Sequence, residues 1–277
     1  MTTPTAFPGT VTDYHSFVCH DFVVNGCDCH VVEPVAALPG KPWVWRAMFW
    51  DAFPGADIEL LKRGYHLAYI EVGNTFGCPD ALAHWDPFYD LLVNQYGFSP
   101  KPALEGLSRG GLYIYRWAAV NTDKVGCLYG DAPVCDFKSW PGGKGSGPGG
   151  ASDWAKLQDD YHFASEAEAL SFTGNPVDIL EPIAKAGIPI IHVCGDIDEV
   201  VPMAENTDIM RERYIKLGGT FVSIVKREIG HHPHGAADTT PVVNFIMAHA
   251  PGSAPNAAAI AAAPKAGDVI VIPAPAA

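Results

Sequence analysis

The sequence predicts an α/β fold built around a mostly parallel sheet. Short apolar segments alternate along the chain with longer segments whose apolar residues recur at helical spacing. Some of the strand-like segments are apolar on both faces, which is typical of strands covered by helices on both sides. With 277 residues, 48% of them hydrophobic, the chain can bury a full-sized core. The length suits one large domain as well as two small ones.

The first half of the chain divides into strands and helices at turn and cap residues. Asn25-Gly26 is a hairpin signal between two strand-like segments. Gly64 closes a helix-like segment, and Asp86 is the candidate N-cap of another. The predicted elements are, in order, strands over residues 14–34, a loop over 35–50, a helix over 54–64, a strand over 65–72 and a helix over 86–97.

The second half continues the alternation and then changes in character. The predicted elements are, in order, a strand before residue 106, a helix after 110, a strand and loop over 124–136, a glycine-rich loop over 140–152, an acidic helical insertion over 151–172, a strand from 189, a helix over 204–219, a strand over 220–230 and a helix over 240–250. Residues 251–277 are rich in Ala and Pro, which predicts a tail or linker. Within them, "DVIVI" (268–272) could add an edge strand.

Charge and composition exclude several classes of function. The chain has 18 Lys and Arg against 31 Asp and Glu, a net charge of −13, and no basic patch, so no nucleic-acid partner is expected. The chain contains no run of eighteen apolar residues, so no membrane-spanning helix is predicted. The N-terminal "MTTPTAFPG" lacks a signal-peptide pattern, so the protein is expected in the cytoplasm, or exported with its signal removed. The seven scattered cysteines favour free thiols, although export would permit one or two disulfides.

A Gly-x-Ser-x-Gly pattern at residues 106–110 has Ser108 at its centre. A serine hydroxyl needs a base to become nucleophilic. It also needs a sharp strand-to-helix turn to project from a sheet, and that crowded turn favours glycines. Gly106, Gly110 and Gly111 supply them, between a strand-like and a helix-like segment. We therefore predict that Ser108 is a nucleophile. The competing interpretation is an ordinary glycine-rich turn with a capping serine.

An acid that orients the base is expected later in the chain, after a strand. "GDIDEVVP" (195–202) offers Asp198, four residues before Pro202, whereas Asp196 fits a role in shaping the turn. The alternative for Asp198 is a helix cap. Asp131, at the end of the strand that follows the nucleophile helix, is a second candidate acid. It ranks behind Asp198, and loop structure or a substrate contact is its other interpretation.

The base is expected after the next strand, where "IGHHPHG" supplies three histidines. His231 is favoured because it directly follows the strand exit. His232 and His234 compete with it, because a shift of one residue changes which ring faces the serine. The cluster also permits a different class of function, a metal-dependent hydrolase or metal-binding protein with acidic partners. Against that, the chain has no His-Glu-x-x-His pattern.

The order serine, aspartate, histidine matches that of an α/β-hydrolase triad. Over residues 14–250, the chain resembles the α/β-hydrolases, and in particular the bacterial esterase and prolyl-oligopeptidase-like group, several members of which act on carbohydrate esters. The resemblance implies an α/β-hydrolase fold in one catalytic domain over residues 1–250, with a mostly parallel central sheet flanked by helices. It also implies a serine esterase that needs no cofactor and acts on a small-molecule or carbohydrate ester.

The resemblance also implies an oxyanion hole, a pair of N–H donors for the negative charge that develops in acyl transfer. One donor is the backbone N–H of the residue after the nucleophile, Arg109. The other is expected from the loop that holds residues 43–46, with Trp45 as a weak choice, because the usual His-Gly pattern is missing there.

Substrate contacts are predicted at tryptophans near the expected mouth of the site. Aromatic faces can pack on the apolar faces of sugar rings, and the candidates are Trp43, Trp45, Trp50, Trp140 and Trp154. The more common role of such residues is to pack loops. Asp131 and His232 are further candidate contacts. Residues 140–175 are predicted to form a small, lid-like insertion over the site.

Overall fold

A ten-stranded sheet forms the centre of the computed structural model, which describes residues 6–274. The strands are, in chain order, β1 (Thr10–Tyr14), β2 (Phe17–Val24), β3 (Cys27–Glu33), β4 (Trp43–Arg46), β5 (His66–Ile70), β6 (Ala103–Leu107), β7 (Cys127–Asp131), β8 (Ile190–Gly195), β9 (Phe221–Lys226) and β10 (Val269–Ile272). Their order across the sheet is β1-β2-β3-β5-β4-β6-β7-β8-β9-β10. The first three strands pair antiparallel, as does β3 with β5, and every pairing from β5 to β10 is parallel.

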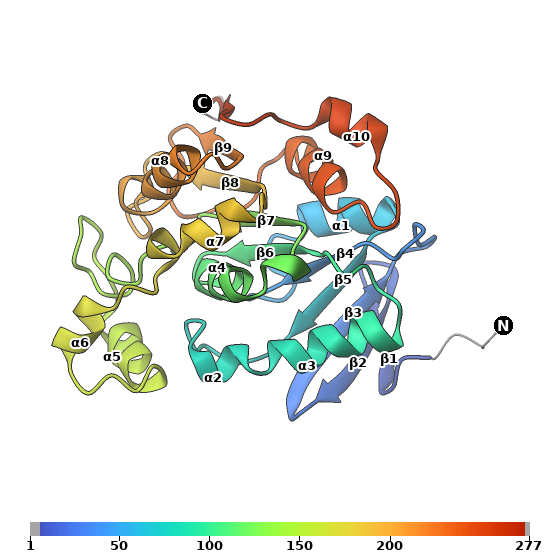
Figure 1. The fold of residues 1–277 in the computed structure, drawn as a ribbon, viewed down its shortest axis with the longest axis horizontal. Coiled ribbons are helices and arrows are strands. Elements are labelled where there is room, and N and C mark those ends of the chain that lie inside the picture. Colours follow the sequence, from blue (N-terminus) through green and yellow to red (C-terminus); the bar gives the residue numbers. More distant parts are fainter. Residues whose placement is uncertain (1–5, 275–277) are drawn as a thin grey trace.

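Helices cover both faces of the sheet (Figure 1). The α-helices are α1 (Gly55–Lys62), α2 (Pro79–Leu82), α3 (Trp85–Asp90), α4 (Gly110–Val120), α5 (Ala151–Asp160), α6 (Glu166–Ser171), α7 (Leu180–Lys185), α8 (Thr207–Lys216), α9 (Thr240–His249) and α10 (Ala257–Ala262). A π-helical turn, η1 (Leu91–Gln95), extends α3, and the 3₁₀ turns are η2 (Thr122–Lys124), η3 (Pro176–Asp178) and η4 (Met203–Glu205). The fold class expected from the sequence is confirmed.

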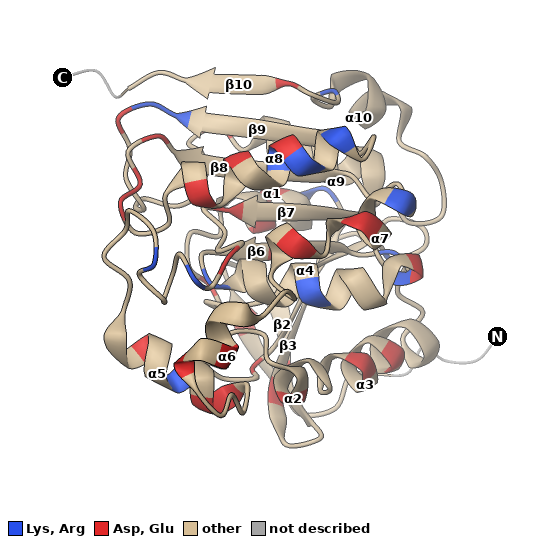
Figure 2. Cartoon of the chain, turned by 60° about the vertical axis from the view of Figure 1, so that its left-hand side comes forward, with Lys and Arg blue, Asp and Glu red and all other residues tan. Residues whose placement is uncertain are grey.

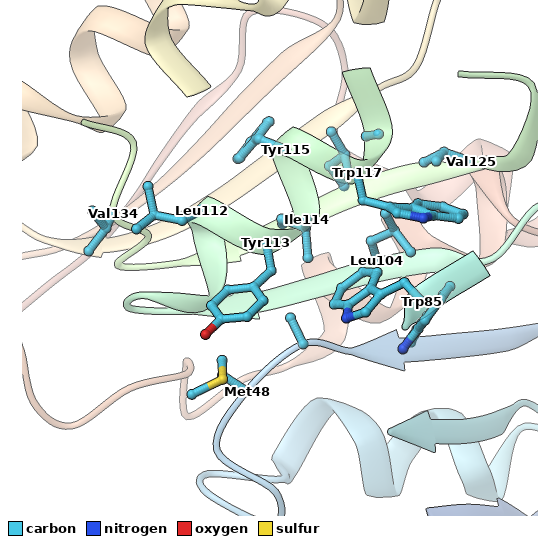
Figure 3. Close-up of a cluster of buried hydrophobic side chains, with 14 of the residues drawn as sticks. Met48, Trp85, Leu104, Leu112, Tyr113, Ile114, Tyr115, Trp117, Val125 and Val134 are labelled. Carbon is cyan, nitrogen blue, oxygen red and sulfur yellow. The ribbon is translucent and has the colours of Figure 1, made fainter. Parts of the chain in front are cut away.

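Two hydrophobic clusters lie on opposite faces of the sheet. One gathers side chains of α3, α4, α5, α7 and α8, and the other those of α1, α9 and α10. Figure 3 shows part of the first, in which Trp117 of α4 lies near Trp85 and Leu104, and Leu112, at the other end of the helix, lies beside Val134. α4 is buried along most of its length. The helix that follows the candidate nucleophile is therefore firmly anchored.

Two local expectations were wrong. β4 forms within residues 35–50, where a loop was predicted. Its four residues are all buried and pair with β5 on one side and β6 on the other. So short a strand, buried on both faces, carries no alternating pattern that marks it. Asp86 is not a helix cap, because α3 begins one residue earlier, and its carboxylate accepts from the Trp117 indole N–H at 3.0 Å.

The segment predicted as a tail or linker is part of the sheet. β10 pairs in parallel with β9, in the register Val269 to Ser223, so "DVIVI" does add an edge strand. α10 packs on α9, and its N-cap Asn256 accepts the backbone N–H of Ala259 at 3.0 Å. Residues 251–274 therefore contribute a helix and an edge strand.

The acidic character of the chain is visible on its helices. Figure 2 shows Asp and Glu on α2, α3, α5 and α6. Within the described residues, no helix combines the length and apolar character needed to cross a bilayer. All seven cysteines lie in this part of the chain, and all are free thiols.

Candidate active site

Ser108 lies in the sharp turn between β6 and α4. Its backbone has φ of 45°, a left-handed conformation that is costly for any residue except glycine. Three backbone hydrogen bonds hold it there. The Ser108 N–H donates to the Asp131 carbonyl at 2.9 Å, and the Ser108 carbonyl accepts from Gly111 at 3.0 Å and Val134 at 2.8 Å. The fold thus fixes an unfavourable conformation that directs the hydroxyl out of the sheet.

Two of the neighbouring glycines are required by space, and the third is not. A Cβ at Gly106 would lie 2.7 Å from the backbone carbon of Gly110, and one at Gly111 would lie 2.6 Å from the Val134 oxygen. At Gly110 the nearest atom would be the Met48 Cβ at 3.6 Å, an ordinary contact. The essential glycines are therefore Gly106 and Gly111, so the motif Gly-x-Ser-x-Gly marks the turn only in part.

This difference gives a matched pair of variants. Gly111→Ala should destabilise the fold by about 1–3 kcal/mol, because the methyl group pushes Val134 away from the Ser108 carbonyl. Gly110→Ala should be neutral or stabilising by up to about 1 kcal/mol, because alanine restricts the unfolded chain and favours the helix. Urea denaturation of both variants measures the difference. Equal losses of stability would show that the steric contact at Gly111 is not decisive.

His231 and Asp198 complete a chain of polar contacts with Ser108. The Ser108 Oγ lies 3.0 Å from His231 Nε2, and His231 Nδ1 lies 2.7 Å from Asp198 Oδ2. Both the imidazole and the carboxylate are almost fully buried. The other carboxylate oxygen of Asp198 accepts the backbone N–H groups of Val200 and Val201 at 2.9 and 2.8 Å. Asp198 is thereby fixed in the turn after β8 and holds the His231 ring towards Ser108.

His234 belongs to a second carboxylate pair. Its Nδ1 lies 3.0 Å from Asp131 Oδ1, while Asp131 Oδ2 accepts from the Tyr129 hydroxyl at 3.1 Å and from the Gly235 N–H. The Asp131 carboxylate is nearly inaccessible, and its oxygens are used within the protein. The predicted substrate contact through Asp131 is therefore corrected: this residue anchors the histidine loop. Lys226 anchors the same loop, because its ammonium donates to the Pro233 carbonyl at 2.5 Å.

His232 is the exposed member of the three histidines. Its ring centroid lies 5.0 Å from that of His231 and 4.9 Å from that of His234. Partial burial and the two neighbouring imidazoles lower the pKa of His232, so its neutral form is favoured. Ligating atoms of the three rings lie within 4.8 Å of one another, close enough for a metal ion. Two of these rings, however, are already oriented by carboxylates, and His231 faces Ser108.

A cavity of about 240 Å³ opens in front of Ser108. Its walls come from five segments that follow strands of the sheet and include Phe49, Phe53, Ser108, Arg109, Trp140, Val200, His231, His232 and His234. The predicted substrate contacts Trp140 and His232 thus do line the cavity. Phe49 and Phe53 were missed by sequence reasoning, because they lie in a loop that carries no motif.

The predicted contacts through Trp43 and Trp45 are corrected, because both indoles are fully buried in the core. Trp43 donates from Nε1 to the Ser99 carbonyl at 2.8 Å. Trp45 stacks on Trp85 at 4.3 Å, and its strand pairs on both sides, so it is not placed as an oxyanion donor. Trp50 stacks on His30, and Trp154 donates to Glu166. No sugar platform forms from these residues.

The loop after β4 places Phe49 beside Ser108. The Arg46 side chain is fully buried and holds this loop. Its Nε donates to the Met48 and Phe49 carbonyls at 3.2 and 3.0 Å, and its Nη2 donates to the Ala52 carbonyl. Within residues 6–274, the backbone N–H groups of Phe49 and Arg109 have no acceptor in the protein, and both residues line the cavity in front of Ser108. They are therefore the candidate oxyanion donors.

The Arg109 side chain is held between the cavity and the insertion. Its guanidinium lies 4.9 Å from the Trp140 ring and 5.6 Å from the Phe49 ring. It also contacts Asp153 of α5 at 3.3 Å. The insertion over residues 140–175 thus touches the candidate site through Trp140 and Asp153. Its role as a lid stays a prediction.

Comparison with known proteins places the fold. No protein-family model matches the chain, and neither does any curated protein. Among solved structures, an acylaminoacyl peptidase of Pyrococcus horikoshii matches with a TM-score of 0.61 and 15% identity, over 80% of this chain and 40% of that chain. A puromycin hydrolase gives 0.61 and 16%, over 94% of this chain and 40% of that chain.

A Pyrococcus furiosus esterase matches with a TM-score of 0.55 and 17% identity, over 82% of this chain and 91% of that chain. This chain therefore spans about two fifths of the length of the peptidase and the puromycin hydrolase, and nearly all of the esterase. Such low identities establish the architecture and nothing finer. With its parallel sheet, its strand-to-helix serine turn and these neighbours, the chain has the α/β-hydrolase fold.

Proposed function

We propose that the protein is a serine hydrolase that cleaves carboxylic esters through an acyl-enzyme. The observation that carries the proposal is the continuous path from Ser108 Oγ to His231 Nε2 at 3.0 Å and from His231 Nδ1 to Asp198 at 2.7 Å. Both distances lie within hydrogen-bond reach. This geometry supports the roles of nucleophile for Ser108, base for His231 and orienting acid for Asp198.

In this mechanism His231 accepts the proton of Ser108 as the serine oxygen attacks the ester carbonyl carbon. The carbonyl oxygen becomes negatively charged, and the N–H groups of Arg109 and Phe49 would stabilise it. When the tetrahedral intermediate collapses, the alcohol leaves with the proton from His231. A water molecule, deprotonated by the same imidazole, then attacks the acyl-enzyme and releases the carboxylic acid. Asp198 holds the ring and stabilises its charged form throughout.

The ester class is supported by the esterase among the structural neighbours, which matches over 82% of this chain and 91% of that chain. A cavity of about 240 Å³ suits a small acyl group. Because Trp140 is the predicted tryptophan that lines this cavity, acetylated sugars belong in the substrate panel beside simple esters.

A serine-directed phosphonate is expected to label the protein at Ser108 and to abolish hydrolysis of p-nitrophenyl acetate in parallel. The activated hydroxyl attacks the phosphorus, and mass spectrometry of the digested protein locates the adduct. A metal chelator should leave the rate unchanged. Loss of activity with the chelator, together with no adduct at Ser108, would instead favour the metal-dependent alternative at the three histidines. A panel of acyl esters, acetylated sugars and p-nitroanilides defines the substrate class.

A further inference from the structure

A second cavity, of about 580 Å³, lies behind the histidine loop. Its size is in the range of ~300–1,000 Å³ typical of ligand pockets. Its walls come from the start of α1, from the histidine loop, from α9 and from the end of β10, and they include Pro54, Ile229, Ala236, Val242 and Ile272. It is more than twice as large as the cavity of about 240 Å³ at Ser108. Space for a large group therefore lies beside the reactive centre and not in it.

The chemistry of this second cavity favours a hydrocarbon. Most of its walls are aliphatic or aromatic side chains. Two of its polar groups are already paired: the Lys226 ammonium donates to the Pro233 and Gly235 carbonyls at 2.5 and 2.8 Å, and the Tyr129 hydroxyl donates to Asp131. Groups satisfied in this way offer little to a polar ligand, whereas an apolar chain gains from leaving water.

Two residues, Phe53 and His234, line both cavities and therefore lie at the partition between them. Their rings lie 5.4 Å apart. His234 is fixed by Asp131 at 3.0 Å, but Phe53 is 45% exposed and sits at a strained φ of 53°. Of the two, Phe53 is the one free to move. A shift of its ring would open a path from Ser108 into the larger space.

We propose that this second cavity binds a hydrocarbon chain of medium length, which reaches it past Phe53. The inference rests on the proposed ester hydrolysis when the chain is part of the substrate: the ester group lies at Ser108 and the chain extends behind the histidine loop. A separate amphiphile with the same kind of chain is the other source of this chemistry, and the experiment distinguishes the two.

The first arm compares p-nitrophenyl acetate, butyrate and octanoate. Ala236→Phe fills the second cavity and should lower the octanoate-to-acetate ratio of kcat/KM at least tenfold. Phe53→Ala opens the partition and should raise that ratio several-fold. Ala261→Phe, on the exposed side of α10, is the matched control for an added aromatic ring and should leave the ratio unchanged. Circular dichroism checks that each variant is folded.

The second arm titrates sodium decanoate into the wild-type protein and into Ala236→Phe in a calorimeter. Binding that is lost in the variant, with an altered ester ratio, supports the substrate chain as the occupant. Binding that is lost with an unchanged ratio supports a separate amphiphile. An unchanged ratio with no decanoate binding overturns the proposal. If wild-type protein hydrolyses none of the esters, the proposed function fails, whatever the calorimetry shows.

Discussion

Ser108→Ala is expected to lower kcat for ester hydrolysis by about 10⁴- to 10⁶-fold, the loss typical when a triad member is removed from a serine hydrolase. The variant lacks the oxygen that forms the acyl-enzyme, so only the oxyanion donors and substrate binding remain to assist water. Thermal unfolding should change little, because alanine bears the same left-handed strain at φ 45° as serine. Stopped-time assays at high enzyme concentration measure the residual rate.

The neighbouring histidines supply the matched control for this prediction. His231→Ala should be about as damaging as Ser108→Ala, because the imidazole 3.0 Å from Ser108 is the proposed base. His232→Ala, which removes the exposed ring, should lower kcat/KM less than about tenfold, since its place is at the cavity wall. A larger loss in His232→Ala than in His231→Ala would reassign the base.

Arg46→Met is expected to lower the free energy of unfolding by about 3–5 kcal/mol, the cost of leaving buried charges without their partner. The Arg46 guanidinium lies 2.6 Å from Asp57 and 3.1 Å from Glu105, and all three side chains are buried. Methionine fills much of the volume but compensates neither carboxylate. The loop that carries Phe49 also loses its anchor, so kcat should fall in the protein that remains folded.

Glu105→Gln is the companion variant, and it tests the charge argument through pH. Burial and the nearby Asp57 carboxylate raise the pKa of Glu105 well above its usual value, because Arg46 offsets them only in part. Within residues 6–274, Glu105 Oε2 has no hydrogen-bond partner, so this oxygen is available to carry a proton.

The sign of the pH dependence follows from the raised pKa. Stability contributed by protonated Glu105 is present below the unfolded-state pKa of about 4.3 and is lost as the pH rises through the higher folded-state pKa. Glutamine still offers Arg46 an oxygen acceptor, its amide carbonyl, and its side chain does not titrate. Relative to wild type, Glu105→Gln should therefore gain stability as the pH rises across this window. Urea denaturation at several pH values measures it, and a pH-independent difference would contradict the raised pKa.

The sequence predicted those parts of the site that depend on local pattern and chain order. Ser108 was proposed because glycines and a strand-to-helix change surround it, and Asp198 because it follows a strand at the expected point; the structure brings both within hydrogen-bond reach of His231. The choice among three histidines was less secure, since it depends on where Lys226 and Asp131 fix the loop. In the structure His231 is the ring beside Ser108.

The place of Phe49 at the Ser108 cavity and the second cavity could not be predicted, because they depend on contacts between distant segments. Arg46 lies in a segment predicted as a loop, yet it is fully buried between Asp57 and Glu105. Trp45 was placed near the mouth for the same reason: the four-residue strand around it has no periodicity to show that it lies in the core.

The loop after β4 also bears on how readily the protein can be engineered for heat tolerance. Phe49, Asp51 and Phe53 all hold left-handed backbone angles, at φ of 56°, 62° and 53°. Glycine or asparagine would adopt these angles with less strain, so this loop is a natural place to seek stabilising substitutions. Phe49 and Phe53 form walls of the Ser108 cavity, so substitutions that relieve their backbone strain are expected to raise stability and lower activity. Asp51 is not part of that wall, and is therefore the position at which the two goals conflict least.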